Sequence, residues 1–94
     1  NTLQLADRTE TIMELEPLDR KWESFGFDVK GADGNDPAAF TEAVGSLDPA
    51  CGKPHVIIAH TVKGKGVSFI EDRAAWHHKI PVGDQVREAI EELE

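Results

Sequence analysis

The 94-residue sequence predicts an α/β fold with a mainly parallel sheet. Residues 27–30 alternate apolar and polar, as in a short strand with one covered face, and residues 55–61 form a continuous β-branched run. Such a run is typical of a strand buried on both faces of a parallel sheet. Parallel neighbours need a crossover, so residues 27–61 are expected to form a βαβ unit with a right-handed connection.

Helices are predicted from apolar spacing and from end signals. The first has Glu16 and Pro17 in its first turn and stops at Gly26. Its apolar stripe is Leu15, Leu18, Trp22 and Phe25. A turn at residues 33–35 precedes a second helix, which is capped by Asp36 and runs to about Leu47. The last helix is expected to be capped near Asp84, with a stripe of Val86, Ile90 and Leu93 and a solvated face of Glu88, Glu91, Glu92 and Glu94.

Composition limits the class of protein. Hydrophobic residues make up 39% and charged residues 30%, as in a soluble globular domain. The net charge of −8 argues against nucleic acid, and no apolar run reaches the roughly 20 residues that cross a bilayer, so a cytoplasmic location without a membrane partner is expected. The chain begins at Asn1 without an initiator Met, which predicts a fragment.

Candidate chemistry gathers after the second predicted strand, where ligands of open α/β sheets bind. Residues 63–66 read Lys-Gly-Lys-Gly, so backbone N–H groups and positive charge could meet a phosphate. The motif lacks P-loop spacing, and by itself a solvated turn is the favoured interpretation. The segment Trp76-His77-His78 has two interpretations. It could form a site in which the Trp ring is an apolar wall beside two imidazoles, or the Trp could simply anchor the loop to the core beside exposed histidines.

The other candidate groups receive plainer interpretations. His55 and His60 bracket the buried strand and are expected to be structural histidines whose hydrogen bonds are satisfied. The lone Cys51 lies in a predicted loop and has no second cysteine for a disulfide or a metal site, so it is given no role.

These segments, taken in order, resemble transketolases. VIIAHTVKGKG at residues 56–66 and EDRAAWH at residues 71–77 are similar to two successive motifs of that family, and His77 lies fourteen positions after Lys63, as in the pattern. Upstream, RTE at residues 8–10, LEPL at 15–18, KWESFGF at 21–27 and DGND at 33–36 resemble the segment that follows the metal motif in split bacterial and archaeal transketolases. The resemblance covers essentially the whole chain. It therefore favours a diphosphate role for Lys63 over a solvated turn.

The resemblance implies a thiamin-diphosphate fold and places residues 1–94 in the C-terminal part of the N-terminal domain that binds diphosphate and metal. Asn1 would supply a side-chain oxygen and Leu3 a carbonyl oxygen to Mg²⁺ or another divalent cation. Lys63 and His77 would lie near the diphosphate, and Leu5 would line the apolar cofactor pocket. His77 would also act in catalysis at the hydroxyls of the donor sugar.

The implied activity is transfer of a two-carbon ketol unit from a ketose phosphate to an aldose, with sugar phosphates as substrates. A pyrimidine-binding domain or subunit would complete the enzyme as a homo- or hetero-oligomer, and the isolated chain is expected to be inactive. His78 stands where the family has Gly, and Ile80 separates Lys79 from Pro81, so this loop departs from the pattern. Two alternatives stay open: a 1-deoxyxylulose-5-phosphate synthase-like enzyme, and a non-catalytic α/β interaction module derived from the family.

Overall fold

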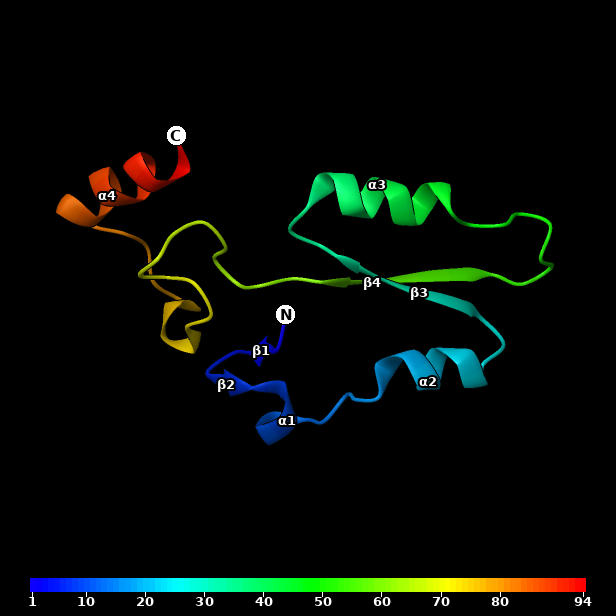
Figure 1. The fold of residues 1–94 in the computed structure, drawn as a ribbon. Helices are drawn as coiled ribbons and strands as arrows, with labels where there is room; N and C mark the ends of the chain where they lie inside the picture. Colours follow the sequence, from blue (N-terminus) through cyan, green and yellow to red (C-terminus); the bar gives the residue numbers. More distant parts are fainter. The chain divides into compact units, whose positions relative to one another are not determined.

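The computed structural model describes residues 1–94, which divide into two compact units. One unit combines Asn1–Glu14 with Val62–Glu94, and the other is the continuous stretch Leu15–Thr61. Figure 1 labels the helices and strands of both units. None of the helices is long and apolar enough to cross a membrane.

The unit Leu15–Thr61 is built on two parallel strands. β3 (Asp28–Asp33) and β4 (His55–His60) pair in register from Asp28 opposite His55 to Asp33 opposite His60. Helix α3 (Pro37–Gly45) connects them, so the predicted βαβ unit and the parallel sheet are confirmed. In Figure 1, α3 lies above the two strands and α2 (Leu18–Ser24) lies below them.

Helix α3 begins as its sequence predicts. The Asp36 carboxylate accepts a hydrogen bond from the Ala38 N–H at 2.8 Å, and Pro37 is the first helical residue. The helix ends at Gly45, two residues before the predicted end. Leu47 instead closes a final turn in which its N–H donates to the Val44 carbonyl oxygen at 3.2 Å.

The prediction for the first helix was wrong at both ends of its stripe. Pro17 precedes the helix with an extended backbone (φ −78°, ψ 109°), so α2 begins at Leu18 and excludes Leu15. Phe25 lies just past the helix and is 78% exposed. Trp22 does pack, with its ring edge-on to Phe27 at a centroid distance of 5.0 Å.

The expected two-sided burial of β4 is also not found in this chain. Residues 55–58 are half-buried, and Ala59 and His60 are exposed. A sheet of two strands with short helices leaves much of each strand open, because further strands and longer helices would be needed to cover both faces. Val67, at 8% exposed, is the only buried apolar side chain of the chain.

The other unit starts with a hairpin that the sequence did not predict. β1 (Leu3–Gln4) pairs antiparallel with β2 (Asp7–Arg8) around a turn in which Leu5 has φ 53°, and α1 (Thr9–Ile12) follows. After Val62 the chain forms irregular turns, the short helix η1 (Ala74–Trp76) and α4 (Asp84–Leu93).

Helix α4 differs from its prediction in two details. Gly83, not Asp84, occupies the position before the helix, and the Gln85 side chain accepts from the Val82 N–H at 3.2 Å. Glu92, predicted to be solvated, accepts hydrogen bonds from the N–H and the hydroxyl of Ser68. These two bonds hold the pKa of Glu92 below its usual range.

Gly34 provides a test of the parallel pairing at the ends of the strands. A Cβ at this position would lie 2.6 Å from Thr61 Cγ2 and 2.9 Å from Ala59 Cβ, so Gly34→Ala should lower the free energy of unfolding by about 1–3 kcal/mol. A Cβ at Gly45, at the end of α3, meets nothing within 4 Å. Gly45→Ala should therefore leave stability unchanged or raise it by up to about 1 kcal/mol. Denaturant unfolding of both variants of the complete protein measures the difference, and equal effects would contradict the close approach at Gly34.

Candidate cofactor-binding site

All five site residues predicted from the sequence lie in the unit formed by Asn1–Glu14 and Val62–Glu94. They are Asn1, Leu3, Leu5, Lys63 and His77. The tertiary structure thus brings the two ends of the chain into one unit, although the whole of the other unit separates them in the sequence.

The N-terminal hairpin presents oxygen donors. The Asn1 side-chain oxygen accepts a hydrogen bond from the Leu3 N–H at 3.0 Å, which ties the two proposed metal ligands into one turn. An amide oxygen has two lone pairs, so accepting this bond does not by itself prevent the oxygen from binding a cation. Leu5 is 56% exposed, and this chain alone does not enclose it in an apolar pocket.

The Lys-Gly-Lys-Gly loop follows β4 and is folded tightly on itself. Gly64 has φ +69°, and a Cβ there would lie 2.5 Å from Ile70 Cγ2, so both conformation and space require glycine. The carbonyl oxygen of Lys63 accepts from the Asp72 N–H at 2.9 Å. The glycine at position 64 is therefore explained by the packing of the loop, whether or not a phosphate approaches it.

The two lysines of this loop differ in their partners. The Lys65 ammonium lies 3.3 Å from the Glu71 carboxylate, which also accepts from the Gly66 N–H at 3.3 Å. Lys63 is half-buried and takes part in none of the ion pairs of the chain. Its charge is therefore the one that the loop leaves available for an anionic ligand.

A bidentate ion pair joins the hairpin to this loop. The Arg8 guanidinium donates to both oxygens of Asp72, at 2.8 and 2.6 Å, and also to the Thr2 hydroxyl at 2.7 Å. The hydrogen bonds from Arg8 hold the pKa of the Asp72 carboxyl below its usual range, and the pair raises the pKa of Arg8. Through Thr2, Arg8 and Asp72, the segment that carries Asn1 is connected to the backbone of Lys63.

Sequence reasoning gave Arg8 and Asp72 no role. Both lie in blocks that resemble the family, RTE at residues 8–10 and EDRAAWH at residues 71–77. Those blocks could have drawn attention to them, but 64 positions separate the two residues, and nothing in the sequence pairs them.

His77 follows η1 in an exposed segment. Trp76 packs against Phe69 with a ring centroid distance of 5.4 Å, which favours the interpretation of Trp76 as an aromatic anchor. The His77 N–H donates to the Ala74 carbonyl oxygen at 3.0 Å, and its ring lies edge-on to that of His78 at 4.4 Å. The packing of Trp76 holds the backbone just before His77. The His77 imidazole is exposed and is therefore able to contact a ligand.

The donors of this unit suit magnesium and a diphosphate in part. Mg²⁺ prefers oxygen ligands in octahedral geometry, and Asn1 and Leu3 would provide two of about six, while phosphates and water commonly fill several others. The ammonium of Lys63 suits a phosphate oxygen. The residues present therefore fit the predicted groups, but they form only a portion of a complete site.

No family model matches the chain. It is, however, 53% identical over 93 residues to an apulose-4-phosphate transketolase subunit of Actinobacillus succinogenes, and 38% identical over 94 residues to the 6-deoxy-6-sulfo-D-fructose transketolase subunit SqwG of a Clostridium species. It is also 30% identical over 93 residues to the transketolase of Rattus norvegicus. The chain belongs to the transketolase family. These matches cover 99%, 100% and 99% of the chain.

The transketolase resemblance predicted from the motifs is thereby confirmed, and the relatives favour it over a 1-deoxyxylulose-5-phosphate synthase. Two of the relatives are named as transketolase subunits, in keeping with the expected split type. The chain spans 33% of the length of the Actinobacillus protein and 14% of the rat enzyme.

The Arg8–Asp72 pair predicts a coupling between the hairpin and the loop. Arg8→Met and Asp72→Asn should each speed amide hydrogen exchange in β1 and β2, and the double variant should add little, because either change breaks the same pair. Arg20→Met, which removes an exposed pair with Glu23 in α2, is the matched control and should leave exchange in the hairpin unchanged. Additive effects of the two changes would contradict the coupling.

The same pair has a predictable pH dependence. The folded pKa of Asp72 is lowered from its ordinary value of 3.8, so the pair contributes fully above that pH. Its contribution is lost as the pH falls further, through the folded pKa. The difference in hairpin exchange between the unmodified protein and Asp72→Asn should therefore be constant from neutral pH to about pH 5 and should shrink below 3.8.

Proposed function

We propose that this chain is the C-terminal part of the diphosphate- and metal-binding domain of a thiamin-diphosphate-dependent transketolase. The enzyme would transfer a two-carbon ketol unit from a ketose phosphate to an aldose. The observation that carries this proposal is the 53% identity, over 99% of the chain, to an apulose-4-phosphate transketolase subunit. The unit that holds all five site residues supports it.

The names of the relatives suggest the substrate class and the partner. Both the Actinobacillus protein and a second one from Phocaeicola vulgatus, 41% identical over 93 residues, are named for apulose 4-phosphate. A ketose phosphate of this kind is the donor that we propose. Because these relatives are named as subunits, we also propose a second subunit that supplies the pyrimidine-binding part, without which this chain would be inactive.

When bound, thiamin diphosphate supplies the nucleophile and the electron sink for cleaving a carbon–carbon bond of the ketose. The residues of this chain have the tasks of binding and orientation. Asn1 and Leu3 would provide oxygen ligands to Mg²⁺, and Lys63 would neutralise charge on the diphosphate. Leu5, exposed in this chain, would contact the apolar part of the cofactor.

His77 is assigned to the sugar. An imidazole held behind the Trp76 anchor can donate a hydrogen bond to a donor hydroxyl and can stabilise charge that develops there. Arg8 and Asp72 are assigned as positioning residues, because they connect the segment that carries Asn1 to the backbone of Lys63.

Reconstitution tests the function as a whole. The complete protein, combined with its partner subunit, thiamin diphosphate and Mg²⁺, should transfer a ketol unit from apulose 4-phosphate to an aldose phosphate, as followed by product analysis. The complete protein without its partner should show no transfer. Efficient transfer in the absence of the partner would contradict the split arrangement, and no transfer with either ketose phosphates or sulfo-ketoses would contradict the assigned reaction.

The metal assignment predicts the effect of Asn1→Ala in the reconstituted enzyme. Loss of one oxygen ligand should weaken Mg²⁺ and thiamin diphosphate binding together by about tenfold or more, with thermal unfolding of the apoprotein little changed. Asn35→Ala, the same chemical change in the turn after β3, is the control and should leave both affinities as they are. Unchanged cofactor affinity in Asn1→Ala would show that the metal motif lies elsewhere.

Lys63 and His77 should differ in which kinetic step they affect. Lys63→Met should chiefly weaken cofactor binding, whereas His77→Asn should lower kcat and raise the donor KM, each by about tenfold or more. Lys65→Met should have a smaller effect than Lys63→Met, because Glu71 already neutralises Lys65. Steady-state kinetics with titrated thiamin diphosphate separates the two residues, and a His77→Asn enzyme with normal kcat and KM would make His77 a structural residue.

A further inference from the structure

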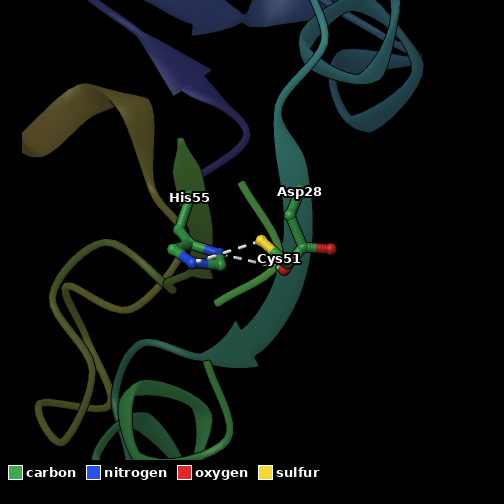
Figure 2. Close-up of side chains that lie close together, drawn as sticks. All are labelled: Asp28, Cys51 and His55. Atoms are coloured by element: carbon green, nitrogen blue, oxygen red, sulfur yellow. Dashed lines mark hydrogen bonds and ion pairs between the residues drawn. The ribbon is translucent and has the colours of Figure 1, made fainter. Parts of the chain in front are cut away.

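Three potential metal ligands from separate elements meet in the unit Leu15–Thr61, which holds none of the residues of the proposed cofactor site. Asp28 opens β3, His55 opens β4, and Cys51 lies in the loop between α3 and β4 (Figure 2). The parallel register places Asp28 directly opposite His55. One ligand atom of each residue lies within 4.8 Å of the other two.

Each nitrogen of the His55 ring lies close to a hydrogen-bond acceptor. Nδ1 lies 3.0 Å from the Asp28 carboxylate, and Nε2 lies 3.1 Å from the Asp48 carbonyl oxygen. Both partners are acceptors, but a neutral imidazole has only one N–H to donate. If Nδ1 donates to Asp28, the lone pair of Nε2 faces the Asp48 carbonyl oxygen and the Cys51 thiol, where a metal ion could take it up.

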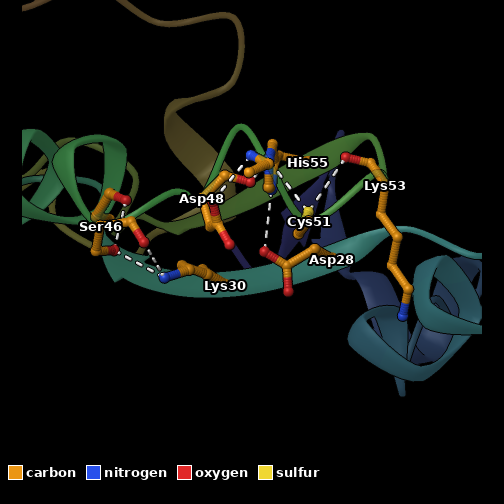
Figure 3. A network of polar contacts seen from close by, with 9 residues as sticks. Asp28, Lys30, Ser46, Asp48, Cys51, Lys53 and His55 are labelled. Atoms are coloured by element: carbon orange, nitrogen blue, oxygen red, sulfur yellow. Dashed lines mark hydrogen bonds and ion pairs between the residues drawn. The ribbon is translucent and has the colours of Figure 1, made fainter.

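Neither nearby lysine directs its ammonium group at the cluster. The Lys30 ammonium donates to the carbonyl oxygen and the hydroxyl of Ser46, at 2.7 and 2.9 Å. The Lys53 side chain extends away from the cluster, as Figure 3 shows. The Cys51 sulfur lies 3.7 Å from His55 Nε2 and 3.6 Å from the Lys53 carbonyl oxygen, so it too is surrounded by electron-rich atoms.

We propose that Cys51, His55 and Asp28 bind a zinc ion. Sulfur, nitrogen and oxygen donors together suit Zn²⁺, whereas Mg²⁺ and Ca²⁺ prefer oxygen alone. Zinc bonds of about 2.3 Å to sulfur and about 2.0–2.2 Å to nitrogen and oxygen put tetrahedral ligand atoms about 3.3–3.6 Å apart. The ligand atoms, which lie within 4.8 Å of one another, would need to approach by up to about 1.2–1.5 Å to reach these separations.

The site would have three protein ligands and one open position for water. His55 is 20% exposed and Asp28 38%, while Cys51 is exposed, so an ion can reach all three from solvent. Binding would convert the Cys51 thiol to a thiolate and release its proton to solvent, so zinc affinity should fall as the pH is lowered. This site does not depend on the proposed transketolase activity.

The test is titration of the reduced complete protein with Co²⁺, followed by displacement with Zn²⁺. A thiolate bound to Co²⁺ gives sulfur-to-metal charge-transfer absorption in the near ultraviolet, which an oxygen-ligated magnesium site does not produce. We expect this band in the unmodified protein and its loss in Cys51→Ser. His55→Gln and Asp28→Ala should each weaken Co²⁺ binding at this band by at least about tenfold.

His60→Gln, at the other end of β4, is the matched control and should retain the band with unchanged affinity. Circular dichroism of each variant verifies that the fold survives. Absence of a Cys51-dependent band in the unmodified protein would overturn the proposal and leave an unmetallated thiol beside a histidine. A band that survives Asp28→Ala at full affinity would overturn the three-ligand site.

Discussion

The proposed cofactor site depends on the bidentate ion pair between Arg8 and Asp72. Its unit is assembled from two segments, Asn1–Glu14 and Val62–Glu94, and this pair is a direct side-chain bond from one to the other. The guanidinium is planar and reaches two carboxylate oxygens and the Thr2 hydroxyl at once, which fixes orientation as well as distance. A lysine at position 8 would keep the charge and lose that geometry.

Charge in the Lys-Gly-Lys-Gly loop is distributed so that the Lys63 ammonium is left for a ligand. Arg8 is engaged by Asp72 and Lys65 by Glu71, whereas Lys63 has no acidic partner in the chain. In a protein with a net charge of −8, such a lysine creates a local site for an anion against an acidic background. The same acidity favours cations elsewhere, as at the Asp28, Cys51 and His55 cluster.

The other unit depends on the register of β3 and β4. Pairing Asp28 with His55 brings together a carboxylate and an imidazole that are 27 residues apart, and the loop after α3 then adds the Cys51 thiol. At the opposite end of the strands, the close approach to Ala59 and Thr61 restricts position 34 to glycine. One backbone arrangement thus explains both the proposed zinc ligands and a tight turn.

Local signals in the sequence determined the βαβ unit and the Asp36 cap, because spacing, capping and turn residues act over a few positions. The sequence motifs also indicated the transketolase family, which the relatives confirm. Tertiary structure decided the rest. The prediction that β4 is buried on both faces was wrong because burial depends on how many strands and helices surround a strand. The start of α2 was set by the extended backbone at Pro17. Tertiary structure also brings together side chains that are far apart in the sequence, namely Arg8 with Asp72 and Cys51 with His55 and Asp28. No local sequence pattern encodes which distant side chains will come into contact.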